Sequence, residues 1–239
     1  MKKVNFKDII IREGPDYIII NKPPYISSLD ERMGEATSIV RLAKEYHPDA
    51  QLCHRLDKET SGILVIAKNS AAYRHLSMQF EHREVTKIYH ALVEGIHDLK
   101  DIAVNAPIAI LDKGLVKIDK NKGKEAETGF NTLEVFTGYT LLECMPVTGR
   151  LHQIRIHLTF LNAPIAGDIQ YGGKELYLSQ IKRKFNLKKD TEEEPLMKRV
   201  ALHAFSIQFI DLEGHEVYTE AEYPKDFAVL VKQLRRYSA

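Results

Sequence analysis

Short apolar runs and alternating stretches dominate the chain, and both patterns are typical of strands. The clearest is the unbroken aliphatic run of residues 63–67, which follows Gly62 and predicts a strand buried on both faces. Residues 17–20 predict an earlier strand that two prolines end, after a first edge strand at residues 9–11. Residues 85–93 alternate in character and predict a further strand.

The second half of the chain adds two hairpins. Residues 128–136 and 140–146 predict a strand pair that turns at Gly138. Residues 202–210 and 216–222 predict another pair with a short polar turn between them. In each pair we expect the two strands to run antiparallel.

Helical spacing of apolar residues occurs between these strands. One helix is expected over residues 37–46 with Thr37 as its N-cap. A second is expected over residues 71–82, where Asn69 or Ser70 supplies the cap. The residues of this second helix that we expect to face inward are Tyr73, Leu76 and Phe80.

A third helix is expected after Gly149, and it has two distinct faces. Its apolar face consists of Leu151, Ile154, Leu158 and Leu161. His152, Arg155 and Thr159 recur at the same spacing on another face, so Arg155 can point into a cleft. A terminal helix is expected over residues 224–236. Without an internal repeat or linker, the pattern predicts one domain, residues 1–239.

Composition and charge limit the partners and the cellular compartment that we expect. The formal net charge of +1 gives no global positive field, so a nucleic-acid partner would have to be bound by local clusters. The two cysteines, Cys53 and Cys144, have no metal-type spacing and suit a reducing compartment. Neither a signal peptide nor a membrane-spanning run is apparent, so we expect a cytoplasmic protein. The charged segment 174–199 is expected to be an exposed insertion without a core-forming pattern.

Charged side chains gather directly before the buried strand. Arg55 and Asp57 lie where a loop can carry chemistry on a rigid scaffold. Taken alone, an Asp in such a loop more often caps a turn or pairs with a neighbour such as Arg55. The histidines of this half fit no common ligand spacing, so no metal site is expected.

These residues resemble the central motif of a known enzyme family. His54-Arg55-Leu56-Asp57, then Thr60-Ser61-Gly62 and an aliphatic strand, is similar to the RluA family of RNA pseudouridine synthases. Family-like segments follow in the right order over about residues 13–230. They are Asn21-Lys22-Pro23, the pair Lys87 and Tyr89, residues 148–155, which read Thr-Gly-Arg-Leu-His-Gln-Ile-Arg, and residues 164–173.

The resemblance implies a fold and a set of roles. Family members have an α+β domain with a central, mostly antiparallel mixed sheet, flanking helices and a long cleft. Asp57 would be the nucleophile, Arg155 would hold it ionised, and Tyr89 would stack on the uracil and help to remove the C5 proton. Arg55 would fill the gap left when the target base leaves the RNA stack. The reaction is an isomerisation and requires no cofactor or metal.

The expected partner is a structured stem-loop of ribosomal or transfer RNA. We expect the protein to bind this RNA as a monomer and not to associate with a membrane. Many family members carry an S4-like RNA-binding domain, whereas this chain starts in the catalytic part, so its cleft and loops are expected to bind RNA. The candidate RNA contacts besides Arg55 are Lys22, His54, Arg74, Arg83, Arg150 and His152. A basic turn at residues 120–124 is either a solvated hairpin tip or a further phosphate contact.

Two other classes remain open at this point. A non-catalytic RNA-binding paralogue would keep the fold and lose the nucleophile, but Asp57, Tyr89 and Arg155 are all present. A glycoside hydrolase would need two carboxylates of complementary protonation, and the motif offers one.

Overall fold

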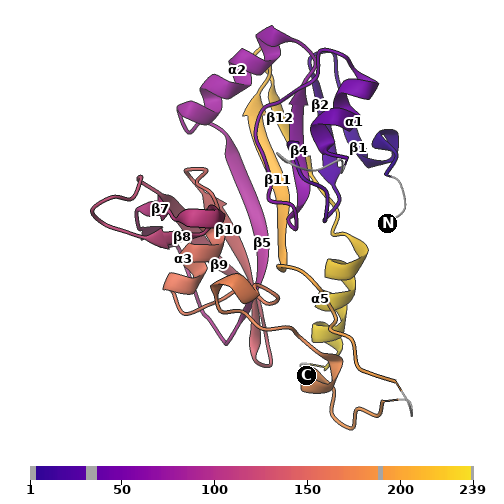
Figure 1. Cartoon of the computed structure of the whole chain (residues 1–239), viewed down its shortest axis with the longest axis vertical. Helices are drawn as coiled ribbons and strands as arrows, with labels where there is room; N and C mark the ends of the chain where they lie inside the picture. Colours follow the sequence, from indigo (N-terminus) through magenta and orange to yellow (C-terminus); the bar gives the residue numbers. More distant parts are fainter. Residues whose placement is uncertain (1–3, 31–36, 188–190, 238–239) are drawn as a thin grey trace. The chain divides into compact units, whose positions relative to one another are not determined.

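The computed structural model describes residues 4–30, 37–187 and 191–237 (Figure 1). The chain divides into two compact units, which are described separately. Unit 1 comprises Met1–Ile88 and His203–Glu222, and unit 2 comprises Tyr89–Leu202 and Tyr223–Ala239. Neither unit is a continuous segment, because the chain passes between them three times. The expectation of a single domain over residues 1–239 stays a prediction.

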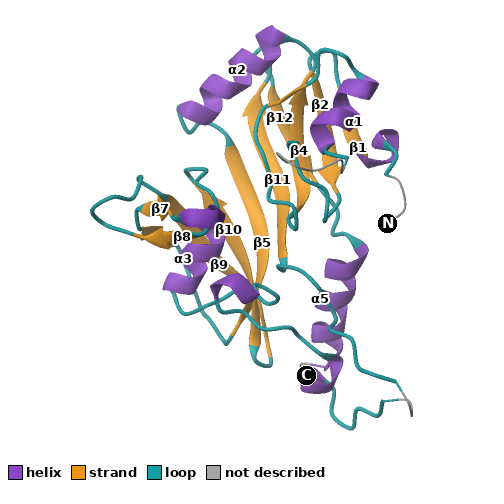
Figure 2. Ribbon diagram, in the orientation of Figure 1, coloured by secondary structure: helices purple, strands orange, loops and turns teal. Residues whose placement is uncertain are grey.

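Unit 1 is built on a mixed sheet (Figure 2). The strands in spatial order are β1 (Ile10–Glu13), β2 (Tyr17–Lys22), β4 (Ser61–Ala67) and β11 (Leu202–Ile210). Two further strands, β3 (Gln51–Leu52) and β12 (Glu216–Glu220), pair with β4 and β11 respectively. The β4–β11 pair is parallel, and the other pairs of this unit are antiparallel.

Strand β4 is the centre of unit 1, and all seven of its residues are buried. The predicted strand at residues 63–67 is therefore confirmed and begins two residues earlier. Gly62 has φ +112° and pairs with Ala204 of β11, where an added Cβ would collide with the carbonyl of Ala204. Only glycine permits this conformation at this close approach. The glycine that opens the strand thus has a packing role.

The helices of unit 1 differ from expectation in detail. Helix α1 (Ile39–Tyr46) is capped by Ser38, whose Oγ accepts from the amide of Arg41, so the assignment of the cap to Thr37 was wrong. Helix α2 (Ser70–Glu81) is capped by Asn69, one of the two predicted residues. A short 3₁₀ helix, η1 (Phe6–Ile9), precedes β1, so the first strand begins one residue later than predicted.

The buried face of α2 is also shifted. It consists of Ala72, Leu76 and Gln79, whereas Tyr73 is 37% exposed and does not face inward as predicted. Gln79 donates to the carbonyl of Ile210 at 2.8 Å and accepts from its amide at 2.9 Å. A polar residue on the buried face therefore ties α2 to the end of β11.

Unit 2 contains an antiparallel sheet and a separate hairpin (Figure 1). The sheet consists of β5 (Thr86–Glu94, mostly in this unit), β10 (Tyr139–Pro146), β9 (Glu127–Phe136) and β6 (Ile102–Asn105) in spatial order. The hairpin pairs β7 (Ile108–Ile110) with β8 (Val116–Ile118), with the 3₁₀ turn η2 (Asp112–Gly114) between them. The predicted β9–β10 turn at Gly138 is confirmed.

The helical elements of unit 2 are α3 (Gln153–Phe160), η3 (Ile169–Tyr171), α4 (Leu178–Ile181) and α5 (Lys225–Tyr237). The last of these confirms the predicted terminal helix. Phe130, Leu158 and Phe227 are fully buried members of the core that these elements share with the sheet.

The description of residues 174–199 as an exposed insertion needs correction. Leu176, Ile181 and Met197 belong to the core of unit 2, and Arg199 is 1% exposed. Residues 188–190 of the segment lie outside the described residues. The charges are mostly exposed as expected, but three apolar side chains spaced along the segment anchor it.

The architecture confirms the expected fold class, a mostly antiparallel mixed sheet with flanking helices. Within the residues that the structure describes, no helix is long and apolar enough to cross a membrane.

Candidate active site

Asp57 lies in unit 1, half-buried, in the loop between β3 and β4. Its carbonyl accepts from the amide of Thr60 at 3.1 Å, which closes the turn before β4. On one side of it, Leu56 is buried and is bonded through both its amide and its carbonyl to the hydroxyl of Ser28. On the other side, the carbonyl of Lys58 accepts from the amide of Tyr25 at 2.8 Å. The backbone around Asp57 is thus fixed on both sides, while Arg55 is exposed.

Lys22 is not a surface residue. It is 0% exposed, and its ammonium donates to the carbonyls of Pro23, Ile26 and Lys58 at 3.1, 2.9 and 3.3 Å. Its assignment as a contact to RNA phosphate was therefore wrong, and so was the alternative of a solvated lysine. A buried charge is retained where hydrogen bonds satisfy it. The ammonium here joins the end of β2 to the Asp57 loop.

His54 contributes to the same loop as an uncharged group. Its Nε2 accepts from the amide of Val65 in β4 at 3.0 Å, which places the ring proton on Nδ1. Burial, with a smaller contribution from Lys87, lowers the pKa of His54 to about 3. Burial also lowers the pKa of Lys87 to about 8, and its ammonium lies 5.8 Å from the centroid of the Phe80 ring. His54 is therefore a neutral support of the loop and cannot offer a positive charge to phosphate at neutral pH.

Arg155 lies in unit 2, on α3, and is 7% exposed. It forms a bidentate ion pair with Asp168, with Nε 2.7 Å from Oδ2 and Nη2 2.7 Å from Oδ1. Nη2 also donates to Oε1 of Gln170 at 2.7 Å. The planar guanidinium is therefore held in one orientation by two residues that the sequence analysis did not select.

An aromatic residue covers the same guanidinium. The Cζ atom of Arg155 lies 4.7 Å from the centroid of the Tyr171 ring, within cation–π range. The Tyr171 hydroxyl accepts from the amide of Val116 at 3.0 Å and lies 2.8 Å from Nδ1 of His152. His152 precedes α3 in the left-handed conformation at φ 51°. The structure thus brings the predicted residues His152 and Arg155 together around Tyr171.

Gln153 explains why the predicted Thr-Gly-Arg turn leads into this helix at a fixed angle. Its Oε1 accepts from the Thr148 hydroxyl at 2.7 Å and from the Arg150 amide at 2.9 Å. Its Nε2 donates to the Glu127 carbonyl at 2.8 Å and to the Thr128 hydroxyl at 3.0 Å. All four hydrogen-bonding positions of the amide are satisfied, which joins the turn to β9.

Tyr89 is on β5 in unit 2, half-buried against the core and paired in register with Cys144. Tyr89 and Arg155 are therefore in one unit, and Asp57 is in the other. Cys144 is buried, and burial raises the pKa of its thiol well above the usual range, which leaves it an apolar neighbour.

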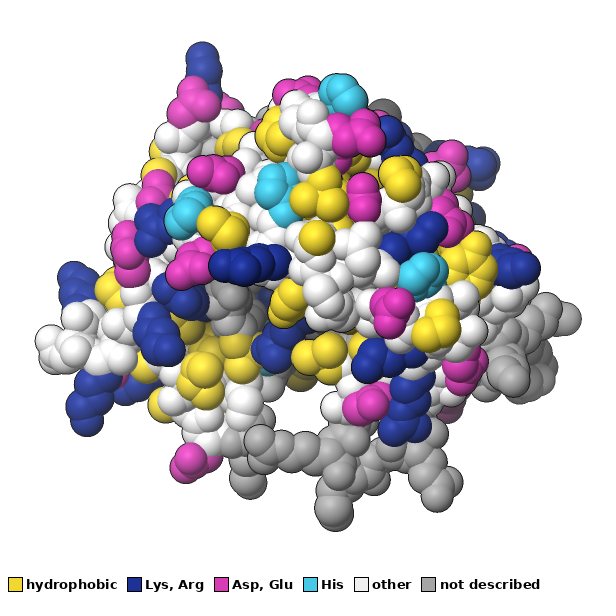
Figure 3. Space-filling view, turned by 90° about the horizontal axis from the view of Figure 1, so that it is seen from above, with side chains coloured by type: hydrophobic (Ala, Val, Ile, Leu, Met, Phe, Trp, Pro, Cys, Tyr) yellow, Lys and Arg dark blue, Asp and Glu magenta, His cyan; other side chains and the backbone are white. Residues whose placement is uncertain are grey.

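The remaining candidate RNA contacts are exposed. They are Arg74 on α2, Arg83 just after it and Arg150 before α3. Arg150 donates from Nε to the carbonyl of Glu125 at 2.9 Å. On the face in Figure 3, Lys and Arg are interspersed with Asp and Glu and do not form one continuous basic patch.

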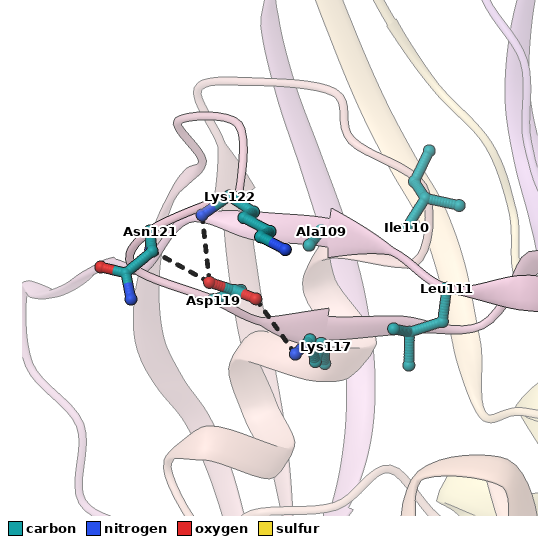
Figure 4. A pocket seen from close by; sticks show the side chains of 7 residues that line it. All are labelled: Ala109, Ile110, Leu111, Lys117, Asp119, Asn121 and Lys122. Atoms are coloured by element: carbon teal, nitrogen blue, oxygen red, sulfur yellow. Dashed lines mark hydrogen bonds and ion pairs between the residues drawn. The ribbon is translucent and has the colours of Figure 1, made fainter.

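The basic turn at residues 120–124 directly follows β8 in unit 2, and Asp119 organises it (Figure 4). Asp119 accepts from the amides of Asn121 and Lys122 and pairs with Lys117 at 3.0 Å. The bond to Lys117 is the main reason that the pKa of Asp119 falls to about 2. A hollow of about 400 Å³ lies beside this turn, and Ala109, Ile110 and Leu111 complete its lining. Among the described residues, no group of three or more His, Cys, Asp or Glu side chains could hold a metal ion.

The chain is similar in sequence to a known protein family and to several known proteins. Residues 16–160 match the family model described as RNA pseudouridylate synthase, a span that includes Asp57, Tyr89 and Arg155. The chain is 35% identical over 215 residues to a protein named ribosomal large subunit pseudouridine synthase C from Vibrio cholerae, covering 87% of this chain and 63% of that protein. It is 32% identical over 240 residues to the uncharacterized RNA pseudouridine synthase YlyB of Bacillus subtilis, covering 95% and 73%.

A solved structure agrees with these matches. Human RNA pseudouridylate synthase domain containing 4 superposes with a TM-score of 0.75 at 26% identity, covering 96% of this chain and 95% of that one. The chain spans 63% of the length of several of the curated relatives. A family model that matches more than half of the chain, together with these relatives, leads to one conclusion. The chain belongs to the RNA pseudouridylate synthase family.

Proposed function

We propose that this protein isomerises specific uridines to pseudouridine in structured ribosomal or transfer RNA. The observation that carries the proposal is the position of Asp57, in a loop of fixed backbone inside the segment that matches the family model. The names of the relatives, which refer to the large ribosomal subunit, favour ribosomal RNA as the first substrate to test.

The reaction breaks the bond between C1′ and N1 of uridine, turns the uracil and forms a bond between C1′ and C5. The proton leaves C5 and N1 gains one, so the reaction is balanced without a second substrate. Asp57 acts as the nucleophile in its ionised form and is regenerated at the end. Tyr89 stacks on the detached uracil and assists removal of the C5 proton.

We assign Arg155 as the positively charged group that stabilises the ionised carboxylate of Asp57. A neighbouring guanidinium favours the ionised carboxylate and restricts its orientation. The bonds to Asp168 and Gln170 occupy Nε and both hydrogens of Nη2. These bonds hold the guanidinium that we assign to Asp57 in one orientation.

The target uridine must leave the RNA stack before it can react, at a cost of about a few kcal/mol. The family resemblance leads us to assign Arg55 to the vacated position, and its side chain is exposed, two residues from Asp57. Arg74, Arg83 and Arg150 are the exposed cations that we assign to phosphate.

The experiment compares the wild-type protein with Asp57→Asn on ribosomal and transfer RNA transcripts. Nucleoside mass spectrometry should find uridine converted without a change in mass, and mapping in RNA from cells with and without the gene should identify the position. Asp57→Asn should fold normally and show no turnover, because the amide keeps the shape but is not a nucleophile. Glu59→Gln removes an exposed carboxylate from the same loop and should retain activity.

Turnover by Asp57→Asn within about tenfold of wild type would rule out Asp57 as the nucleophile. Tight RNA binding without any conversion by the wild-type protein would instead favour a non-catalytic RNA-binding paralogue.

A further inference from the structure

The loop that carries Asp57 is held from both sides by one short segment of unit 1, residues 22–28. The Oγ of Ser28 donates to the carbonyl of Leu56 at 2.7 Å and accepts from its amide at 3.0 Å. The carbonyl of Lys58 accepts from Lys22 and Tyr25. The residues immediately before and after Asp57 therefore each have their peptide groups bound by the same segment.

The Ser28 hydroxyl takes the place of the backbone groups that would otherwise bond to the amide and carbonyl of Leu56. It satisfies both main-chain groups of one buried residue, as a neighbouring strand would. Ser28 is 4% exposed and Leu56 is 6% exposed, so water is not at hand to replace either bond. An amide and a carbonyl that lose their partner in such a place are costly to leave unsatisfied.

The segment itself is anchored by helix α1. The amides of Ile39 and Val40, in the first turn of α1, donate to the carbonyls of Ser27 and Ser28 at 2.9 and 3.1 Å. These amides have no partner within their own helix, so the carbonyls also complete the start of α1. A continuous set of bonds thus leads from α1 through Ser28 to the residue before Asp57.

We propose that Ser28 is a positioning residue for Asp57, which sets the place and direction of the carboxylate through the backbone of Leu56. The effect on the reaction rests on the proposed function, in which Asp57 is the nucleophile. The restraint of the Leu56 backbone by Ser28 rests on the hydrogen bonds alone. A displacement of a reacting group by about 1 Å is enough to lower a rate by on the order of a hundredfold. The restraint therefore matters to the chemical step and little to RNA affinity.

The test uses Ser28→Ala, Ser28→Cys and the control Ser206→Ala. Ser206 is a serine of similar burial, 3% exposed, on β11 of the same unit. Ser28→Ala should lower the single-turnover rate by about 10- to 100-fold with RNA affinity within about twofold of wild type. Ser28→Cys keeps a weak donor and acceptor, so its rate should be intermediate. Ser206→Ala should keep the wild-type rate.

Hydrogen exchange supplies a readout that is independent of activity. The Leu56 amide should exchange at least about tenfold faster in Ser28→Ala than in wild type, and at the wild-type rate in Ser206→Ala. Unchanged exchange at Leu56 overturns the restraint. Faster exchange with an unchanged single-turnover rate overturns the positioning role and leaves Ser28 as a structural residue. No pseudouridine formation by the wild-type protein contradicts the proposed function instead, and exchange at Leu56 still decides the restraint.

Discussion

Arg155 and Asp168 form a bidentate ion pair with both side chains buried, 7% and 2% exposed. The same unit contains a second bidentate pair, in which the buried Arg199 donates from Nε and Nη2 to the two carboxylate oxygens of the partly exposed Asp226. The two pairs have similar geometry, but only Arg155 is assigned to the chemistry. They therefore form a natural comparison of structural and catalytic effects.

Asp168→Asn and Asp226→Asn should both destabilise the protein, because each leaves a buried guanidinium with a poorer partner. The loss for Asp168→Asn should be about 3–5 kcal/mol, and the loss for Asp226→Asn should be smaller because Asp226 is 30% exposed. Only Asp168→Asn should also lower the single-turnover rate, by at least about tenfold, at a temperature where both variants are folded. Equal rates for the two variants would show that the orientation of Arg155 by Asp168 does not affect the reaction.

Arg55→Ala should affect base extrusion more than the chemistry. We expect its single-turnover rate to fall most on a folded hairpin and least on the same loop with the stem disrupted, where the uridine is already unstacked. Arg74→Ala, which removes an exposed cation elsewhere in unit 1, should reduce binding of both RNAs alike. A defect of Arg55→Ala that is equal on both RNAs would make Arg55 an ordinary phosphate contact.

Gly62→Ala should be severely destabilising, by at least about 3 kcal/mol, or should prevent folding. The positive φ strains any side chain, and the new Cβ would meet the carbonyl of Ala204. Gly149→Ala is the control, because no atom lies within 4 Å of the position of its Cβ. Denaturant unfolding measures both, and a loss below about 1 kcal/mol for Gly62→Ala would contradict the close β4–β11 approach.

Lys87 should make stability depend on pH in the alkaline range. Burial lowers its pKa in the folded protein to about 8 from the ordinary value of 10.5, so the unfolded chain binds the proton more strongly. The buried charge of Lys87 therefore does not lower the stability of the folded protein above pH 10.5. It lowers that stability increasingly as the pH falls towards 8. Lys87→Met should flatten the rise in stability between about pH 8 and 10.5, measured by denaturant unfolding. Lys44→Met, at an exposed position on α1, should leave the slope unchanged, and an unchanged slope for Lys87→Met would refute the lowered pKa.

Much of the fold could be predicted because its signals are local. The aliphatic run at residues 63–67 and the turn at Gly138 lie in short stretches whose pattern is not changed by distant partners. The cap of α1 was placed one residue early because Thr37 and Ser38 are both suitable residues, and only the hydrogen bond to Arg41 distinguishes them.

The parts that failed depend on partners far along the chain. Lys22 looked like a surface cation, but the carbonyls that bind it include that of Lys58, 36 residues away. Its place in phase with the buried Ile18 and Ile20 of β2 was the available signal. Asp168 lies in the family-like segment 164–173, but nothing in the spacing links it to Arg155 on α3.

The parallel pairing of β4 with β11 has a consequence for synthesis. Ser61 and His203 are partners in this pair, yet 142 residues separate them. At a translation rate of about 5–20 residues per second, β11 emerges roughly 7 to 28 seconds after β4. Throughout that interval Ser61 and Gly62 lack the β11 backbone that pairs with them in the fold, because β3 pairs only with Ile66 and Ala67 at the other end of β4. An incomplete strand edge is the kind of edge that associates with other chains. Expression at low temperature or with chaperones should therefore raise the yield of folded protein, and fragments that end before β11 should aggregate.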